Sequence, residues 1–263
     1  MRARAVAALL ALALLAGCAS TVTGSGRGSG AAPRRSPAAG TSAVPSSTAS
    51  APSTPSSSTT PVPAGVTPCP QTDPYAAVGC LRQVLSDFWS GQLNSVIGEA
   101  VVLDAYPAQV PRPCRPGIEL GTAITCKVDL TLYVSHQFLT LIEANFHGVD
   151  LALALASLTA HEIGHVLQYT LHQPEIEQHD PSDATVRRIE QQADCLSGVW
   201  AGHAASTGTL DAHRFVADAV KLISLVSSNP EIATHGTPPQ RRAAIERGLN
   251  GGTPSACHLV TFH

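Results

Sequence analysis

The sequence has few aromatic side chains, 4% of its 263 residues, and no basic runs interleaved with them. Between residues 67 and 263, 11 Lys and Arg stand against 19 Asp and Glu, which gives a net charge of −8. Nucleic-acid-binding domains usually present a basic face that neutralises phosphates. The acidic balance therefore excludes nucleic acid as an expected partner.

Long hydrophobic runs are also scarce. The apolar stretch at residues 5–15 is too short to cross a bilayer comfortably, but it follows Arg2 and Arg4 and leads into Leu-Ala-Gly-Cys. This order is typical of a bacterial lipoprotein signal peptide. We expect residues 1–17 to be removed and Cys18 to be lipidated, which would anchor the protein to the cell membrane on its extracytoplasmic side. An ordinary cleaved signal peptide or a short anchor is the alternative.

The segment after Cys18 has almost none of the residues that build a core. Of the 48 residues from 19 to 66, 41 are Ser, Thr, Pro, Ala or Gly. Such a composition does not bury enough apolar surface to offset the entropy of ordering, so we expect residues 18–66 to form a lipidated, disordered tether. Its random-coil reach is roughly 35–40 Å. Residues 67–263 then form a single domain with a substantial core.

No CxxC pair occurs, which disfavours a cysteine-rich zinc site or a thioredoxin-like centre. Beside Cys18, six cysteines remain, and an even number behind an export signal is typical of disulfides. Six cysteines allow 15 connectivities. Closeness along the chain favours Cys69–Cys80 and Cys114–Cys126, and it leaves Cys195 to pair with Cys257.

Helical segments outnumber strands in the predicted secondary structure. Apolar residues recur at helical spacing, or capping residues mark a helix start, at residues 73–93, 151–171 with Asp150 as cap, from Asp180 and Pro181 onward, 211–226, and from Thr237 to near Gly248. Alternating or β-branched residues predict strands at 100–106 and within 123–135. The predicted fold class is helix-rich α+β with a small sheet.

The stretch LTAHEIGHVLQYT, residues 158–170, places two histidines four residues apart in an otherwise apolar helix. A helix stacks His161 and His165 on one face, where two neutral imidazoles can bind one zinc ion. Glu162 lies about 100° round the helix, from where its carboxylate could take a proton from a zinc-bound water. This is the HExxH motif. The alternative is a helix with solvent-facing or hydrogen-bonded histidines, against which the apolar surroundings argue.

A catalytic zinc site of this type needs a third protein ligand. The metzincin extension would require Gly and His where the chain has Gln168 and Leu171, so it fails. The segment IEQQAD offers Glu190 and Asp194 on one face of another helix. We predict that Glu190 ligates the zinc and that Asp194 accepts the second N–H of a ligand histidine, His161 in the first instance. An exposed carboxylate near Arg187 is the alternative for Glu190.

Three stretches in this order, AHEIGHVLQ, EQQADCLSGVW and THGTPPQRRAAIERGLNGG, resemble the bacterial neutral zinc metallopeptidases of the zincin fold. The resemblance spans about residues 85–257. It implies a zincin-like domain, a single zinc at the two motif histidines and Glu190, Glu162 as general base, and a link between Cys195 and Cys257. Val166 stands where the family usually has a second histidine, and we expect no effect because this position lies off the metal-facing stripe.

Further candidates for the cleft are weaker. His235, in a predicted loop, could donate to the oxyanion of a tetrahedral intermediate or only cap local structure. Tyr169 and Tyr133 are alternative donors. The strand at Leu132–Ser135 could line the cleft and pair with an extended peptide by edge addition.

The leading hypothesis is a membrane-tethered zinc endopeptidase acting outside the cytoplasmic membrane on a peptide or protein substrate. Zinc would lower the pKa of its bound water, and Glu162 would deprotonate it and pass the proton to the leaving amine. A non-catalytic, zinc-stabilised lipoprotein that binds a partner or cell-envelope component is the second hypothesis. An exported metal-buffering protein is the third, and a single three-ligand site disfavours it.

Overall fold

The computed structural model describes residues 69–70, 73–94, 100–176, 182–227 and 235–259. All of them belong to one compact unit of the chain, Ser57–His263. The predicted signal peptide, Cys18, the tether and the helix start at Asp180 and Pro181 lie outside the described residues. No helix within these ranges combines the length and the apolar character needed to cross a membrane.

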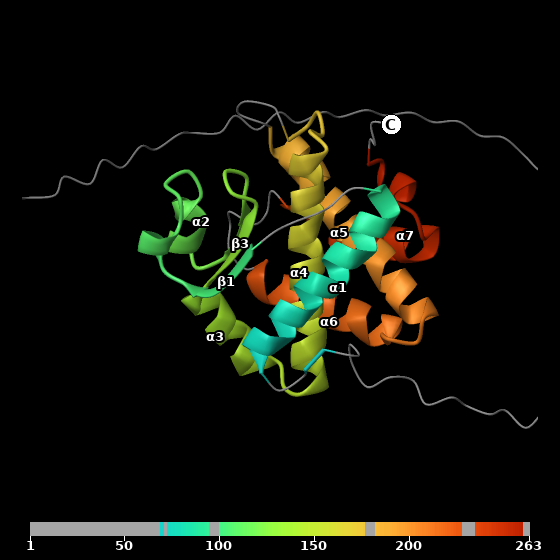
Figure 1. Cartoon of the computed structure of the whole chain (residues 1–263), viewed down its shortest axis with the longest axis horizontal. Coiled ribbons are helices and arrows are strands. Elements are labelled where there is room, and N and C mark those ends of the chain that lie inside the picture. The colour runs from blue at the N-terminus through green and yellow to red at the C-terminus, as the bar shows by residue number, and fades with distance from the viewer. Residues whose placement is uncertain (1–68, 71–72, 95–99, 177–181, 228–234, 260–263) are drawn as a thin grey trace, which may run out of the picture. The chain divides into compact units, whose positions relative to one another are not determined.

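The helix-rich α+β prediction is confirmed (Figure 1). The helices are α1 Pro74–Leu93, α2 Arg115–Glu119, α3 His136–Asn145, α4 Val149–Thr170, α5 Asp183–Ser206, α6 Ala212–Val226 and α7 Pro238–Gly251. The strands are β1 Ala100–Ala105, β2 Ala123–Cys126 and β3 Thr131–Ser135. Two short 3₁₀ turns follow β1 and α7, at Pro107–Gln109 and Pro254–Cys257.

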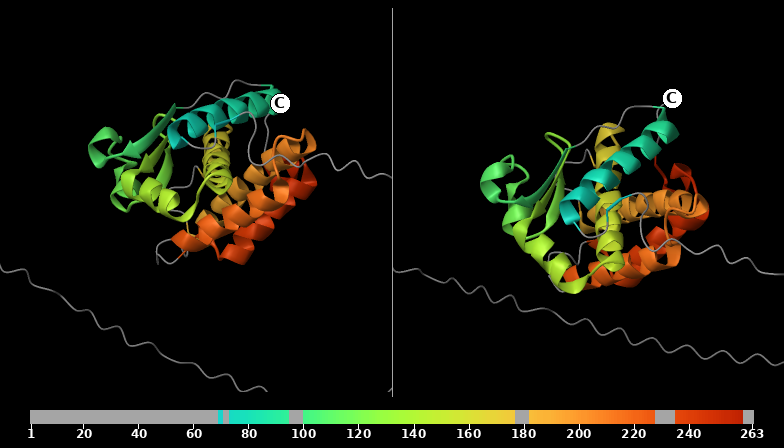
Figure 2. Two further views of the ribbon diagram at one scale, coloured as in Figure 1. Left: turned by 90° about the horizontal axis from the view of Figure 1, so that it is seen from below. Right: turned by 60° about the horizontal axis from the view of Figure 1, so that its bottom comes forward.

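Helix α4 lies between the two halves of this unit (Figure 1). The sheet, with α2 and α3, lies on one side of α4, and α5 and α7 lie on the other, while α6 crosses α4 (Figures 1 and 2). Helix α1 packs across α4 through buried Leu81, Leu85 and Trp89. Because α4 is apolar on nearly its whole circumference, it is buried between these layers rather than lying on the surface.

The sheet has the strand order β1-β3-β2. β3 pairs in parallel with β1 and antiparallel with β2, and all five of its residues are buried. The expectation that the strand at Leu132–Ser135 adds an extended peptide is therefore wrong, because both edges of β3 already carry a neighbour. Within the described part of the chain, β2 is the edge strand on the side of α4.

A glycine brings α4 and α5 into close contact at the HExxH segment. A Cβ built on Gly164 would lie 2.8 Å from Cα of Ala193, closer than real Cβ atoms approach. The absent side chain therefore lets the backbones meet where α4 carries the two histidines and α5 carries Glu190. Helices α5 and α7 cross at a similar contact, because a Cβ on Gly198 would clash with the carbonyl oxygen of Ile245.

Several predicted element bounds differ from the structure. Helix α4 begins at Val149, and its N-cap is Gly148 with φ 54°, not Asp150, which lies in the first turn. Helix α7 has the predicted capping box at Thr237 and Gln240 but continues to Gly251. Helix α3 was not predicted from the sequence, because the alternating pattern of β3 runs into its N-cap, Ser135.

The described cysteines pair as Cys69–Cys80, Cys114–Cys126 and Cys195–Cys257. The first two disulfides close loops of 11 and 12 residues, and the third spans 62. Cys114–Cys126 lies in a small core beside the sheet that also contains Tyr133, whereas Cys195–Cys257 ties the end of the described chain to α5. The third bond therefore constrains the helix that carries Glu190.

Candidate metal centre

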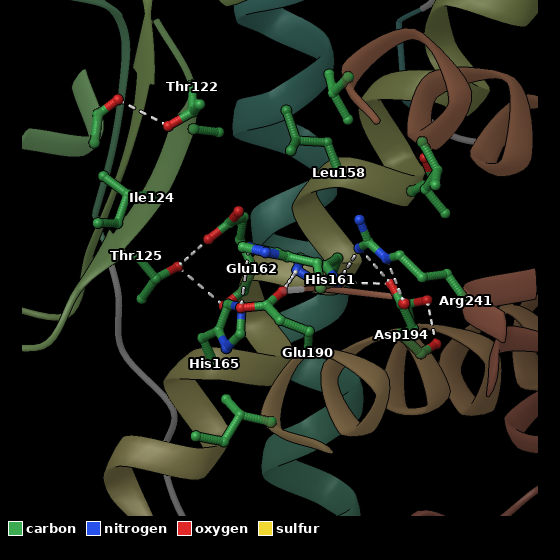
Figure 3. Close-up of a pocket in the computed structure, with 18 of the residues that line it drawn as sticks. Thr122, Ile124, Thr125, Leu158, His161, Glu162, His165, Glu190, Asp194 and Arg241 are labelled. Carbon is green, nitrogen blue, oxygen red and sulfur yellow. Dashed lines mark hydrogen bonds and ion pairs between the residues drawn. The ribbon is translucent and has the colours of Figure 1, made fainter. Parts of the chain in front are cut away.

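Three side chains from two helices converge on one point (Figure 3). His161 and His165 come from α4 and Glu190 from α5, and one nitrogen or oxygen atom of each lies within 4.8 Å of the others. Nε2 of His161 is 3.2 Å from Oε2 of Glu190, and Nε2 of His165 is 3.5 Å from Oε1. Glu190 is far from the two histidines in the sequence, but the close contact of α4 and α5 at Gly164 brings them together.

The other nitrogen of His161 is held by a carboxylate. Nδ1 lies 2.9 Å from Oδ1 of Asp194, and Asp194 in turn accepts two hydrogen bonds from Arg241, at 2.7 Å from Nε and 2.8 Å from Nη2. Asp194 and Arg241 are both buried. Burial by itself would lower the pKa of His161, but the hydrogen bonds with Asp194 and Glu190 outweigh burial and raise that pKa to about 10 in the metal-free protein.

The other nitrogen of His165 is held by an amide. Nδ1 lies 2.8 Å from Oε1 of Gln168. The amide nitrogen of Gln168 donates to the carbonyl oxygen of Ile189 at 2.8 Å and to Oε1 of Gln192 at 2.9 Å. Because these two acceptors take both amide hydrogens, Oε1 of Gln168 must face the imidazole as an acceptor. Nδ1 of His165 then carries the hydrogen.

Each Nδ1–H donates to its own acceptor, so Nε2 of both histidines is directed at Glu190. A zinc ion would take the place of the hydrogens that the two Nε2 atoms carry in the metal-free protein. Burial would raise the pKa of Glu190, but the positive charge of His165 holds it well below its usual range, so the carboxyl group is ionised. Two imidazole lone pairs and one carboxylate form the donor set of a catalytic zinc site with one open position. The residues present therefore fit a zinc ion.

Glu162 lies next to this donor set and outside it. Its carboxylate accepts a 2.7 Å hydrogen bond from the hydroxyl of Thr125 on β2, and the same hydroxyl lies 3.0 Å from the backbone oxygen of Glu162 (Figure 3). Thr125 and Glu162 are both buried. The contact fixes one carboxylate oxygen against the edge strand and leaves the other available for proton transfer.

Of the three weaker candidates, His235 and Tyr169 line the cavity at the site and Tyr133 does not. Nε2 of His235 lies 3.5 Å from Oε1 of Glu190, and burial lowers the pKa of His235, so its imidazole is neutral near pH 7. Tyr169 lines the same cavity, with its ring 6.5 Å from that of His165. Tyr133 donates to Asp129 in the small core beside the sheet and does not line the cavity.

A cavity of about 560 Å³ opens over these residues, a volume typical of small-molecule and peptide sites. Its walls include Thr122 and the first residues of β2, one face of α4, the middle of α5, and parts of α6 and α7. The HExxH face, Glu190 and His235 all border the same space. The three candidate metal ligands therefore line a cavity large enough to hold part of a substrate.

Comparison with known proteins bears on this site directly. A family model described as "Putative neutral zinc metallopeptidase" matches residues 86–262, which include all three converging side chains and Glu162. The chain belongs to this family.

The chain also has relatives among bacterial proteins. The chain is 31% identical over 171 residues to the uncharacterized protein YpfJ of Escherichia coli (strain K12). It is 29% identical over 174 residues to the uncharacterized proteins Mb2605 of Mycobacterium bovis and Rv2575 of Mycobacterium tuberculosis. Each match covers 58% of this chain and 59% of the relative, so the chain spans under two thirds of their length. No solved structure matches the chain significantly.

Four residues that surround the candidate metal site were not identified from the sequence. They are Thr125, Gln168, Gln192 and Arg241. Gln168 carried a usable signal, because it lies three residues after His165 and so on the same helix face. For Thr125 and Arg241 no such signal exists, because their partners lie 37 and 47 residues away along the chain.

Proposed function

We propose that the protein is a zinc-dependent endopeptidase, tethered to the extracytoplasmic side of the cell membrane. The observation that carries the proposal is the convergence of His161, His165 and Glu190 beside a buried carboxylate that is not itself one of the converging ligands. A purely structural zinc site usually has four protein ligands. Three ligands with Glu162 adjacent are the arrangement expected for hydrolysis.

A bound zinc ion would supply the Lewis acidity that polarises a peptide carbonyl and makes water more acidic. Glu162 then has the position of the general base: the carboxylate oxygen not held by Thr125 takes a proton from the attacking water and delivers it to the leaving amine nitrogen. Asp194 and Gln168 keep the histidine rings oriented throughout, because each accepts an Nδ1–H.

Two further parts of the cavity suit a peptide. β2 is the edge strand bordering the cavity, so an extended substrate can pair with its backbone, in the role that the sequence assigned to the neighbouring strand. The neutral imidazole of His235, whose Nε2 lies 3.5 Å from Oε1 of Glu190, is the donor to the developing oxyanion. A His235→Ala variant with unchanged turnover would remove that role and leave the rest of the mechanism intact.

The decisive experiment combines metal analysis with peptide hydrolysis. The purified full chain should contain one zinc per molecule by plasma mass spectrometry and should cleave members of a quenched-fluorescence peptide library. Glu162→Gln should retain the zinc and lose at least about 100-fold in turnover, because a positioned general base contributes on the order of 10²–10⁴. Glu143→Gln, at an exposed position on α3, is the matched control and should behave as the unmodified protein.

Two results would contradict the proposal: a purified protein without stoichiometric zinc, or a Glu162→Gln variant that hydrolyses peptides at the original rate. Full zinc occupancy without hydrolysis of any library member would instead favour the non-catalytic, zinc-stabilised lipoprotein.

The membrane tether is proposed from the order of basic residues, apolar run and Leu-Ala-Gly-Cys at the start of the sequence. Cells grown with an alkyne-labelled palmitate should incorporate the label into the protein, and Cys18→Ala should abolish incorporation and release the protein from the membrane fraction. An unlabelled protein, or a Cys18→Ala variant that stays with the membrane, would disprove lipidation at this residue.

A further inference from the structure

The cavity follows one face of α4. Leu158, His161, His165 and Tyr169 succeed one another at intervals of three or four residues, and all four line the cavity. Because a helix rises about 1.5 Å per residue, Leu158 lies about one turn before the first histidine and Tyr169 about one turn after the second. The metal ligands therefore occupy the middle of the cavity, and its two ends have different surroundings.

The end beyond Leu158 is apolar. Helix α6 contributes Ala219, Leu222 and Ile223 from one of its faces, and α7 contributes Ile245. α5 runs antiparallel to α4 here, since Asp194 meets His161 and Ile189 meets Gln168 further along. The residues of α5 and α7 beyond Asp194 and Arg241 are therefore placed beside Leu158, at the apolar end.

The hydroxyl groups at this end are already engaged. Ser157 donates to the carbonyl oxygen of Ala154 at 2.9 Å, and Ser197 donates to that of Asp194 at 2.7 Å. Neither hydroxyl hydrogen is left to attract a polar group. A polar side chain placed here would lose its hydration with little compensation, whereas an apolar one would gain free energy by leaving water.

The opposite end contains charged side chains. Lys127, Tyr169 and Glu175 line it together with Ile176 and Ile189, and the ammonium group of Lys127 lies 5.9 Å from the centre of the Tyr169 ring. An apolar side chain at that end would cover charged groups. A large apolar side chain of a bound peptide is therefore accommodated better at the Leu158 end than at the Tyr169 end.

We propose that the end of the cavity formed by Leu158, Ala219, Leu222, Ile223 and Ile245 is a specificity pocket. It takes a large apolar side chain, such as that of Leu, Phe or Met, from the peptide residue next to the cleaved bond. The assignment rests on the proposed peptidase function and adds its substrate class. The occupant is a side chain of the substrate because the pocket is continuous with the cavity that holds the metal ligands and the edge strand β2.

The experiment compares zinc-loaded full-length protein on peptides that differ only at the residues flanking the cleaved bond. Burying a large apolar side chain should raise kcat/KM by about 10- to 100-fold over alanine. Ala219→Leu narrows the pocket and should reverse most of that preference while alanine-containing peptides are cleaved almost as before. Ala217→Leu, at an exposed position on the same helix, makes the same change outside the cavity and should alter neither rate.

Leu222→Ala is the complementary variant, should Ala219→Leu fold poorly. It enlarges the pocket and should shift the preference towards Phe and Trp over Leu. Hydrolysis without an apolar preference, or an Ala219→Leu variant that behaves as Ala217→Leu does, would overturn the pocket and leave the peptidase function standing. If no peptide is hydrolysed the peptidase function fails, and fluorescence anisotropy with Leu- and Ala-containing peptides then decides the pocket: equal affinities overturn it.

Discussion

The two histidines of the HExxH helix differ in what holds them. Nδ1–H of His161 donates to a carboxylate, Asp194, which in turn accepts hydrogen bonds from Arg241. Nδ1–H of His165 donates to a neutral amide, Gln168, which in turn donates to Gln192 and to a backbone carbonyl. A charged acceptor stabilises the protonated imidazole and makes it a more basic ligand, whereas an amide mainly sets its orientation. We call His161, Asp194 and Arg241 the charged half of the site, because a carboxylate sets the basicity of its histidine. His165, Gln168 and Gln192 form the neutral half, in which an amide sets the orientation of the ring.

The two halves also differ in how they are connected to the fold. The charged half reaches α7 through Arg241, at a crossing of helices where glycine permits close contact. The neutral half reaches the end of the described chain, because Gln192 donates to the carbonyl oxygen of Cys257 at 3.1 Å, and Cys257 is bonded to Cys195. A disulfide and an ion pair thus serve the same purpose, holding a ligand's partner in place.

The largest effect should follow from removing the carboxylate in the charged half. Asp194→Ala leaves the buried guanidinium of Arg241 without its partner, and breaking such a pair should lower the free energy of unfolding by about 3–5 kcal/mol. Urea denaturation measures this. Asp183→Ala, an exposed change in the first turn of the same helix, should cost less than about 1 kcal/mol. Equal losses for the two variants would mean that the ion pair contributes little.

The next effect is a pH dependence of the metal-free protein. The pKa of His161 is about 10 in the folded chain and 6.5 in the reference state, so its protonated form favours folding. This stabilisation is complete below pH 6.5 and is lost as the pH rises towards 10. The free energy of unfolding, measured with a chelator present, should fall over this interval.

Variants in the two halves sharpen this test. Asp194→Asn should flatten the decline because it removes the charge that raises the His161 pKa, while Gln168→Ala should keep it. A metal-free protein whose stability is constant from pH 7 to 10 would contradict the electrostatic account of the His161 half.

The loss of zinc affinity should be larger for a variant of the charged half than for a variant of the neutral half. Asp194→Asn should weaken zinc binding by about 10- to 100-fold, the usual cost of removing a carboxylate behind a ligand histidine. Gln168→Ala should weaken it by about 2- to 10-fold, the range for a neutral hydrogen bond. Competition with a chelating dye gives both dissociation constants. The comparison would fail if Gln168→Ala had the larger effect.

The smallest effect should come from Gln192. Its removal leaves Gln168 with the carbonyl of Ile189 as a remaining partner, so Gln192→Ala should weaken zinc binding by at most about threefold. The same dye competition measures it. A loss greater than that of Gln168→Ala would show that the link to Cys257 matters more than the direct contact with His165.

Much of this site was predictable because its residues repeat along helices. The i, i+4 spacing of His161 and His165, and of Glu190 and Asp194, follows from helical geometry alone. Pairing the two segments also needed only the requirement for a third ligand. Element ends were less predictable: α4 begins at a glycine with positive φ, and α3 begins at a serine that also ends a strand. Local pattern cannot separate a strand from a helix at such a junction.

The helix-rich class, the family and the candidate ligand residues could be predicted from the sequence, since each depends on spacing within a helix or on residue type. Three contacts could be seen only in the folded chain: Thr125 holds Glu162, Arg241 holds Asp194, and β2 rather than β3 is the edge strand at the cavity. These contacts join segments tens of residues apart. They arise from which surfaces pack together, and no local periodicity encodes that packing.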